Sequence, residues 1–319
     1  MSGGSKNSKT LFASFLMILA ALVWGASFVA QSQGLEQVGC FTFLAFRSYL
    51  ASVALLPVAL IFYIKGKKSG EGSHGEYKSF FSKRTVVAGI ICGAIMFTGL
   101  ALQQFGIANS SVGKSGFLTT LYILVVPIIG GIFFKKKIRP IMWFFIAIAL
   151  AGMFCLCVSD TGSFTFGDIM LLGCAVAFGF HIVVIGYYAD SVDGVRMSFF
   201  QFITSSVLGT VTMLLFETPD PEVLKSIWFS LFYTGVMSSG VAFTLQIIAQ
   251  KNLSETVTSL LMSLESVFAA LSGALFLHEK LTTQQLIGCV LVFAATVLAQ
   301  LPIENLLKSI KNRKHKTAG

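Results

Sequence analysis

Charged residues are scarce in this chain of 319 residues. Asp, Glu, Lys and Arg make up 12% of it, about half the fraction typical of soluble domains. Hydrophobic residues reach 55%, and apolar runs long enough to cross a bilayer as helices recur along most of the length. This composition excludes an ordinary soluble domain and predicts an all-α polytopic membrane protein.

Cysteine pairs of the metal-binding or redox type are also missing. None of the six cysteines forms a Cys-x-x-Cys pair, and all occur within or at the edges of apolar runs. We expect them to pack inside helices as small side chains, and we expect no metal and no cofactor. They are Cys40, Cys92, Cys155, Cys157, Cys174 and Cys289.

Motifs of enzymes are absent as well. The chain has no His-Glu-x-x-His, no paired Asp and no Gly-x-Ser-x-Gly, so we do not expect an enzyme. Its net charge of +9 lies in loops and tails, which favours membrane orientation over nucleic-acid binding. The first apolar run, 11–32, is too long for a cleaved signal and lacks a clear cleavage site.

Breaks at charged and turn-rich segments divide the chain into ten candidate membrane helices. If the N-terminus is cytoplasmic, nineteen Lys and Arg lie inside and only Lys114, Lys225 and Lys280 lie outside. Because positive charge accumulates on the cytoplasmic side, both tails are predicted inside. The ten segments are 11–32, 39–64, 85–106, 111–134, 140–158, 167–188, 196–216, 224–248, 254–277 and 282–301.

The second half of the chain repeats the first. An offset of 154 residues places Trp24-Gly25 on Phe178-Gly179, and an offset of 143 places Gln103 on Gln246. Five spans per copy require the second copy to be inverted, which is the usual architecture of secondary transporters with a midplane site. The predicted organisation is a cytoplasmic tail (1–10), two five-helix repeats (11–158 and 166–301) and a basic cytoplasmic tail (302–319).

Residues 108–115, ANSSVGKS, fit a loose nucleotide-binding pattern. A phosphate-binding loop needs a strand before it and a helix after it, whereas this segment connects two membrane helices. The equivalent connection in the second copy, NLSETVTS, lacks Gly-Lys. We therefore expect no ATP binding, and interpret the segment as a helix start with Asn109 or Ser111 as N-cap.

The chain resembles the EamA-type carriers of the drug/metabolite transporter superfamily over about residues 11–301. Trp24-Gly25, VGKSGFLTTLYILVVP (112–127), LESVFAALSGALFLHEKL (264–281) and the two-copy arrangement carry the resemblance. Ser266 stands where the family tends to have Pro, and His278 where Gly is usual. The resemblance implies a ten-helix carrier in a bacterial-type inner membrane, often an exporter of amino acids, other metabolites or toxic compounds.

Two full charges fall well inside the predicted spans, Arg47 and Glu265. At about 1.5 Å per residue both lie near the middle of a core about 30 Å thick. Ionisable groups at such depth are functional candidates. Arg47 suits a substrate carboxylate, and Glu265 suits a proton or an ammonium group. The alternative is an ion pair between them that locks two helices together.

Five other residues complete the predicted substrate site. Tyr122 is the repeat counterpart of Glu265, while Trp24 and His181 occupy nearly equivalent places near mid-depth. Gln103 and Gln246 lie near opposite membrane faces, where they could serve gates. Each of the five could equally be a hydrogen-bonded or packed core residue.

These features predict a secondary active transporter, proton-coupled or facilitative, that exports a small polar metabolite such as an amino acid or a related compound by alternating access. The alternative is a flippase or exporter for a lipid-linked or hydrophobic drug-like substrate. The expected partners are the small-molecule substrate and membrane lipids, with no nucleic acid and no ATP. We expect a monomer or a homodimer.

Overall fold

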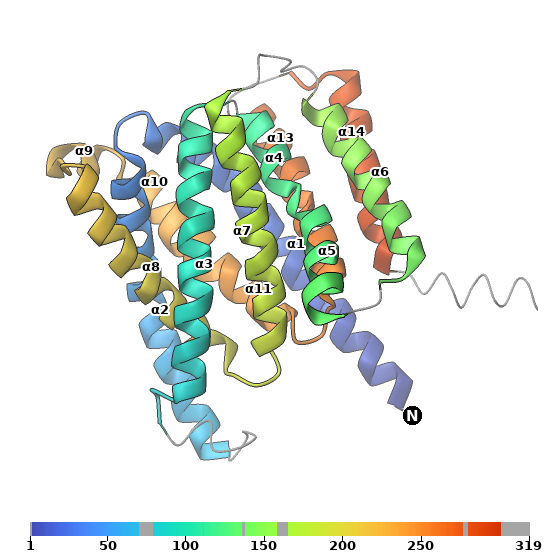
Figure 1. The fold of residues 1–319 in the computed structure, drawn as a ribbon, viewed down its shortest axis with the longest axis horizontal. Coiled ribbons are helices and arrows are strands. Elements are labelled where there is room, and N and C mark those ends of the chain that lie inside the picture. The colour runs from blue at the N-terminus through green and yellow to red at the C-terminus, as the bar shows by residue number, and fades with distance from the viewer. Residues whose placement is uncertain are drawn as a thin grey trace, which may run out of the picture.

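The computed structural model describes residues 2–69, 79–110, 112–135, 138–157, 165–276 and 280–300, which form helices joined by short connections (Figure 1). Residues 301–319, including the predicted basic tail, lie outside the described residues, as do Ser111 and His278. The helices are α1 (Ser2–Leu35), α2 (Cys40–Ser69), α3 (Lys83–Ala108), α4 (Val112–Thr120), α5 (Tyr122–Phe134), α6 (Pro140–Cys157), α7 (Phe166–Tyr188), α8 (Gly194–Phe216), α9 (Pro221–Ser226), α10 (Trp228–Phe232), η3 (Tyr233–Ala242), α11 (Phe243–Ala249), α12 (Glu255–Met262), α13 (Leu264–Phe276) and α14 (Thr283–Gln300).

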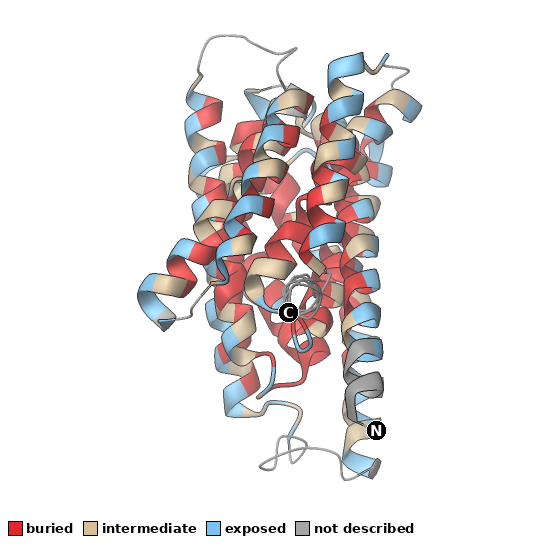
Figure 2. Ribbon diagram, turned by 90° about the vertical axis from the view of Figure 1, so that its right-hand side faces the viewer, coloured by how far each residue is buried: buried red, intermediate tan, exposed pale blue. Residues whose placement is uncertain are grey.

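Apart from the short helix α9, the described helices form ten apolar segments. Nine helical spans are long and apolar enough to cross a membrane, and Pro140–Leu156 is a shorter apolar helix. Large apolar side chains cover the outside of the bundle, including Phe144, Leu214 and Val290, each more than half exposed. Figure 2 shows buried residues concentrated on the helix faces turned inward. The prediction of an all-α polytopic membrane protein is confirmed.

Successive spans run in alternating directions (Figure 1). We call the end of the bundle at which α1 begins the proximal face, and the opposite end the distal face. The first copy therefore begins at the proximal face with α1, and the second begins at the distal face with α7. This reversal is the inverted repeat predicted from the sequence.

Three of the predicted continuous helices are interrupted. The span 111–134 breaks at Leu121 between α4 and α5, and the span 254–277 breaks at Ser263 between α12 and α13. These two positions coincide within one residue when the copies are aligned. The span 224–248 passes through α10, the π-helix η3 and α11.

The break in the second copy forms without the proline expected at 266. Ser263 donates its hydroxyl to the Leu260 carbonyl at 2.7 Å, and Ser266 donates to the Ser263 carbonyl at 2.8 Å. The hydroxyls thus occupy carbonyls next to the break and support it locally. In the first copy Pro127 lies inside α5, where its ring and missing N–H weaken the helix.

Two glycines let each copy press against the broken helix of the other. A Cβ atom on Gly25 of α1 would lie 2.7 Å from the Ala269 nitrogen of α13. A Cβ on its counterpart, Gly179 of α7, would lie 2.6 Å from Val125 Cγ1 of α5. The small residue after Trp24 is therefore explained by close helix packing.

The Gly-Lys-Ser segment has a structural role different from the one expected. Asn109 is the C-cap of α3 and donates from Nδ2 to the Phe105 carbonyl at 2.8 Å, so of the two predicted N-caps Asn109 is wrong, while Ser111 lies outside the described residues. Lys114 forms an ion pair with Asp168 of α7 at 2.6 Å. The segment therefore holds two helices together at the distal face.

Candidate functional site

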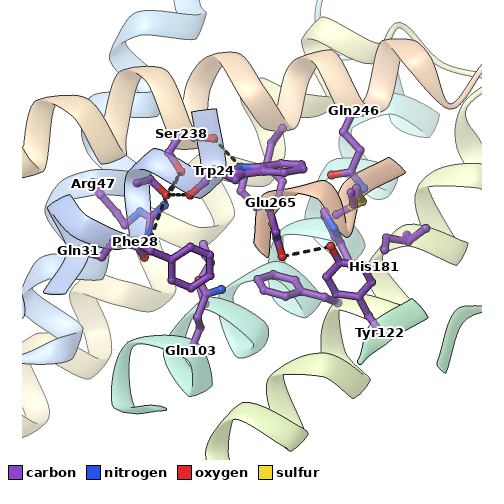
Figure 3. A pocket seen from close by; sticks show the side chains of 16 residues that line it. Trp24, Phe28, Gln31, Arg47, Gln103, Tyr122, His181, Ser238, Gln246 and Glu265 are labelled. Atoms are coloured by element: carbon purple, nitrogen blue, oxygen red, sulfur yellow. Dashed lines mark hydrogen bonds between the residues drawn. The ribbon is translucent and has the colours of Figure 1, made fainter. Parts of the chain in front are cut away.

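A cavity lies inside the bundle and is walled by both copies (Figure 3). It contains about 440 Å³ of space free of atoms, counting the part that opens to solvent. All seven residues predicted to bind substrate lie in its wall. The 16 lining residues are Trp24, Ser27, Phe28, Gln31, Arg47, Leu100, Gln103, Tyr122, Phe178, His181, Ile182, Ser238, Phe243, Gln246, Met262 and Glu265.

Most of the wall consists of residues in equivalent positions of the two copies. Six pairs contribute both members, which means that the cavity lies on the pseudo-symmetry axis between the repeats. The pairs are Trp24 with Phe178, Ser27 with His181, Phe28 with Ile182, Leu100 with Phe243, Gln103 with Gln246, and Tyr122 with Glu265.

Arg47 enters the cavity from the distal third of α2 and is 1% exposed. Its Nε donates to Ser239 Oγ at 3.1 Å, one terminal nitrogen donates to Gln31 Oε1 at 2.7 Å, and the other to Ser238 Oγ at 3.3 Å. A guanidinium carries five N–H donors, so these three bonds leave donors for a ligand. The π-helix places Ser238 and Ser239 together at Arg47, and π-helical turns are frequent at functional sites.

A hydrogen-bond network fixes the surroundings of Arg47. Trp24 Nε1 donates to the Ser238 carbonyl at 3.2 Å, which ties α1 to η3. Ser27 donates its only hydroxyl proton to the Trp24 carbonyl at 2.8 Å, so it accepts from Gln31 Nε2 at 3.1 Å. Gln31 Oε1 also accepts from Gln104 Nε2 at 2.7 Å. The guanidinium is therefore held in one orientation before any ligand arrives.

Glu265 does not pair with Arg47 among the described residues. Its carboxyl oxygen accepts a hydrogen bond from the Tyr122 hydroxyl at 3.1 Å, and the residue is 5% exposed. The alternative of a locking ion pair between Arg47 and Glu265 thus does not apply to this conformation. Tyr122 and Glu265 each follow a helix break. Tyr122 is the first residue of α5, directly after the break at Leu121, and Glu265 is the second residue of α13, after the break at Ser263.

Of the remaining predicted residues, His181 and Gln246 make polar contacts in the cavity wall and Gln103 does not, among the described residues. His181 Nε2 lies 3.2 Å from Gln201 Oε1, and its ring packs edge-on against Phe243 with centroids 5.8 Å apart. Gln246 donates to Gln250 Oε1 at 3.0 Å. Gln103 has no hydrogen-bond partner within the described part of the chain.

Aromatic rings form the apolar side of the cavity. Trp24 and Phe243 meet edge to face with centroids 5.0 Å apart, and Phe178 lies 6.4 Å from Phe243. Phe28 also reaches the wall, as Figure 3 shows. A ligand in this cavity would therefore meet polar groups at fixed places and ring surfaces between them.

Sequence reasoning missed several lining residues, of which Ser27, Gln31 and Ser238 contact the Arg47 network. Two signals could have found some of them. The repeat register pairs Ser27 with the predicted His181 and Phe178 with the predicted Trp24. Gln31 lies seven residues after Trp24, which is the same face of a helix.

Two inverted five-helix copies with broken helices around a central polar cavity define a membrane transporter. The sequence profile of the EamA-like transporter family matches residues 11–158 and 165–301, so the chain belongs to this family, within the drug/metabolite transporter superfamily. It is a transporter and not an enzyme.

Three relatives agree with this assignment. An uncharacterized transporter of Archaeoglobus fulgidus is 27% identical over 94% of this chain and 90% of its own length. The uncharacterized transporter YoaV of Bacillus subtilis is 22% identical over 86% of this chain and 92% of its own. A WAT1-related chloroplastic protein of Arabidopsis thaliana is 24% identical over 91% of this chain and 70% of its own.

A solved crystal structure shares the fold. It superposes with a TM-score of 0.73 at 18% sequence identity, covering 92% of this chain and 98% of the other. At this identity the likeness concerns the fold alone.

Proposed function

We propose that the protein is a secondary active transporter that exports a small polar metabolite, an amino acid or a related compound, by alternating access. The observation that carries this proposal is the burial of Arg47 and Glu265 in one cavity between the inverted copies, without an ion pair to either side chain among the described residues. Ionisable side chains are costly inside a membrane, and those that occur there usually mark a substrate or ion pathway. The two copies, 11–158 and 166–301, would rock against each other around the cavity.

Arg47 would bind the substrate carboxylate. Its pre-oriented guanidinium donates charge-assisted hydrogen bonds that suit a planar anion, and its free donors support this role. Glu265 would carry a proton or receive the substrate ammonium group, with Tyr122 holding the carboxyl group in place. The aromatic rings would cover the apolar part of the molecule.

The orientation follows from charge. The proximal face would be cytoplasmic, because the topology predicted from the sequence assigns nineteen Lys and Arg to the side of the N-terminus and three to the other. The membrane would be a bacterial-type plasma membrane, as the family resemblance suggests. Outward movement would then carry substrate from the proximal to the distal face.

A hydrophobic drug-like or lipid-linked substrate is the second candidate. The rings of Trp24, Phe28, Phe178 and Phe243 in the wall favour it. Such a substrate would not depend on the Arg47 guanidinium for a carboxylate contact, and its transport would depend on the lipid composition of the bilayer.

Thermal stability of the purified protein against amino acids, organic acids, amines and nucleotides tests the proposal. A bound substrate raises the melting temperature with dose. The substitution Arg47→Gln should lower the affinity for carboxylate-bearing compounds by about ten- to a hundredfold, as expected for the loss of hydrogen bonds to a charged group. If no water-soluble compound raises the melting temperature but apolar drugs or lipids do, the second candidate is supported.

A further inference from the structure

Gln246 presents an amide oxygen to the cavity in an orientation that its neighbours determine. The residue is fully buried and lines the cavity (Figure 3). Gln250 donates from Nε2 to the Ile182 carbonyl of α7 at 2.9 Å. Because a carbonyl can only accept, Gln250 must direct its own oxygen away from Ile182 and towards Gln246.

The hydrogen bonds from Gln246 to Gln250 and from Gln250 to Ile182 form a short relay. With Gln250 so oriented, Gln246 can only donate to it. Gln246 Nε2 donates to Gln250 Oε1 at 3.0 Å. Its amide oxygen is left facing the other way, and it has no hydrogen-bond partner within the described residues. Nearly all buried polar groups are paired, so this acceptor on the cavity wall is available to a donor group of a molecule in the cavity.

The other copy shows that this relay is not a general requirement of the fold. The counterpart of Gln246 is Gln103, which also lines the cavity. The counterpart of Gln250 is Ile107, which has no amide. The amide orientation is thus fixed in the second copy only, at the proximal end of the cavity, whereas Arg47 supplies donors towards the distal end.

We propose that Gln246 Oε1 accepts a hydrogen bond from an N–H or O–H group of the transported molecule, and that Gln250 is the positioning residue that holds this oxygen in place. This inference rests on the proposed function and narrows it. The substrate class is a small metabolite with a carboxylate for Arg47 and a hydrogen-bond donor at a second position.

Matched compounds test the inference on the full-length purified protein. The probes are homoserine with O-methylhomoserine, tyrosine with O-methyltyrosine, and glutamine with its N,N-dimethylamide. Each pair differs in a donor replaced by methyl groups. Affinities from dose-dependent melting should favour the donor member by about tenfold, the value of one well-placed hydrogen bond.

Three variants separate the role of Gln246 from general effects. Gln246→Leu should abolish the preference, because it lowers the affinity only for the compound of each pair that carries the hydrogen-bond donor. The control Gln300→Leu, on α14 and outside the cavity wall, should keep it. Gln250→Leu should reduce the preference. Gln250→Glu should restore it in the protonated form, which can donate to the Ile182 carbonyl and accept from Gln246; a merely structural role for Gln250 would not produce this rescue. If Gln246→Leu does not fold, Gln246→Met takes its place.

The outcomes distinguish this inference from the proposed function. If no compound of any pair binds, the proposed function is wrong and the inference falls with it. If compounds bind but both members of every pair bind equally, or if Gln246→Leu retains the preference, the inference alone is overturned.

Discussion

The ion pair between Lys114 and Asp168 joins the two copies at the distal face, and its removal should loosen that junction. Lys114 lies on α4 of the first copy and Asp168 on α7 of the second, with Nζ and Oδ2 2.6 Å apart. Asp168 also accepts from Ser110 Oγ at 3.0 Å and from the Thr165 backbone nitrogen at 2.7 Å. Its side chain is fully buried, and that of Lys114 is 18% exposed.

The expected magnitude follows from this burial. Removing one partner of a fully buried ion pair costs about 3–5 kcal/mol, because the other charge stays buried without compensation. Lys114 keeps some contact with solvent, which lowers the cost, and Asp168→Asn retains an oxygen for Thr165. We therefore expect about 2 kcal/mol for Asp168→Asn and a coupling of about 1–2 kcal/mol with Lys114→Met.

A double-mutant cycle on unfolding in mixed detergent micelles measures the coupling. The chain provides a matched control, since Lys225 and Glu222 form an ion pair at the same distance of 2.6 Å but are 72% and 79% exposed. Exposed pairs contribute little, so Lys225→Met with Glu222→Gln should show no measurable coupling. Equal coupling in the two pairs would refute the argument from burial.

Among the described residues, the equivalent junction at the proximal face has no charge pair. The counterparts of Asp168 and Lys114 are Ser14 and Val257, and the Ser14 hydroxyl has no partner within the described residues. The ion pair should therefore favour closure of the distal side. In Asp168→Asn, amide hydrogen exchange should increase at the distal ends of α4 and α7 and stay unchanged at the proximal junction; an increase at both faces would contradict this.

Two further predictions concern the cavity and its wall. Glu265→Gln should abolish transport driven by a pH gradient in proteoliposomes yet permit substrate exchange, because a neutral amide cannot carry the proton; intact coupling to the gradient would disprove the proton role. Gly235→Val should lower the melting temperature by several degrees and weaken carboxylate binding, since a Cβ there would lie 2.9 Å from the Arg47 carbonyl. Gly131→Ala, where a Cβ meets nothing within 4 Å, is its control, and equal losses in both would exclude a specific contact.

Much of the fold could be predicted because the membrane imposes a simple rule. A helix must be apolar over about 20 residues to cross the bilayer, so the spans are visible as runs. The repeat register then placed Tyr122 opposite Glu265 and Gln103 opposite Gln246, and the structure brings all four to one cavity. Their role in substrate binding remains a prediction.

The interior of the spans could not be predicted in the same way. Whether Gln31 faces Arg47 or lipid depends on helix rotation, which hydropathy alone does not determine in a helix apolar on all sides. The π-helix that brings Ser238 and Ser239 to Arg47 has no distinctive sequence signal. Next to the break before Glu265, the hydroxyls of Ser263 and Ser266 donate to backbone carbonyls. The family resemblance led us to expect a proline at this place, and the chain has none there.

The differences between the copies give the cavity a direction. Both copies supply rings, a glutamine and a helix break, which make an approximately symmetric wall. The polar exceptions are unequal: Arg47 corresponds to Gln201, Gln31 to Ile185, Ser238 to Ile95 and Gln250 to Ile107. Donors thus gather in the distal half around Arg47, and the fixed acceptor of Gln246 lies in the proximal half. A molecule with a carboxylate at one end and a donor at the other would therefore have one preferred orientation along the transport path, and the symmetric part of the wall would allow it to keep that orientation as the two copies exchange conformations.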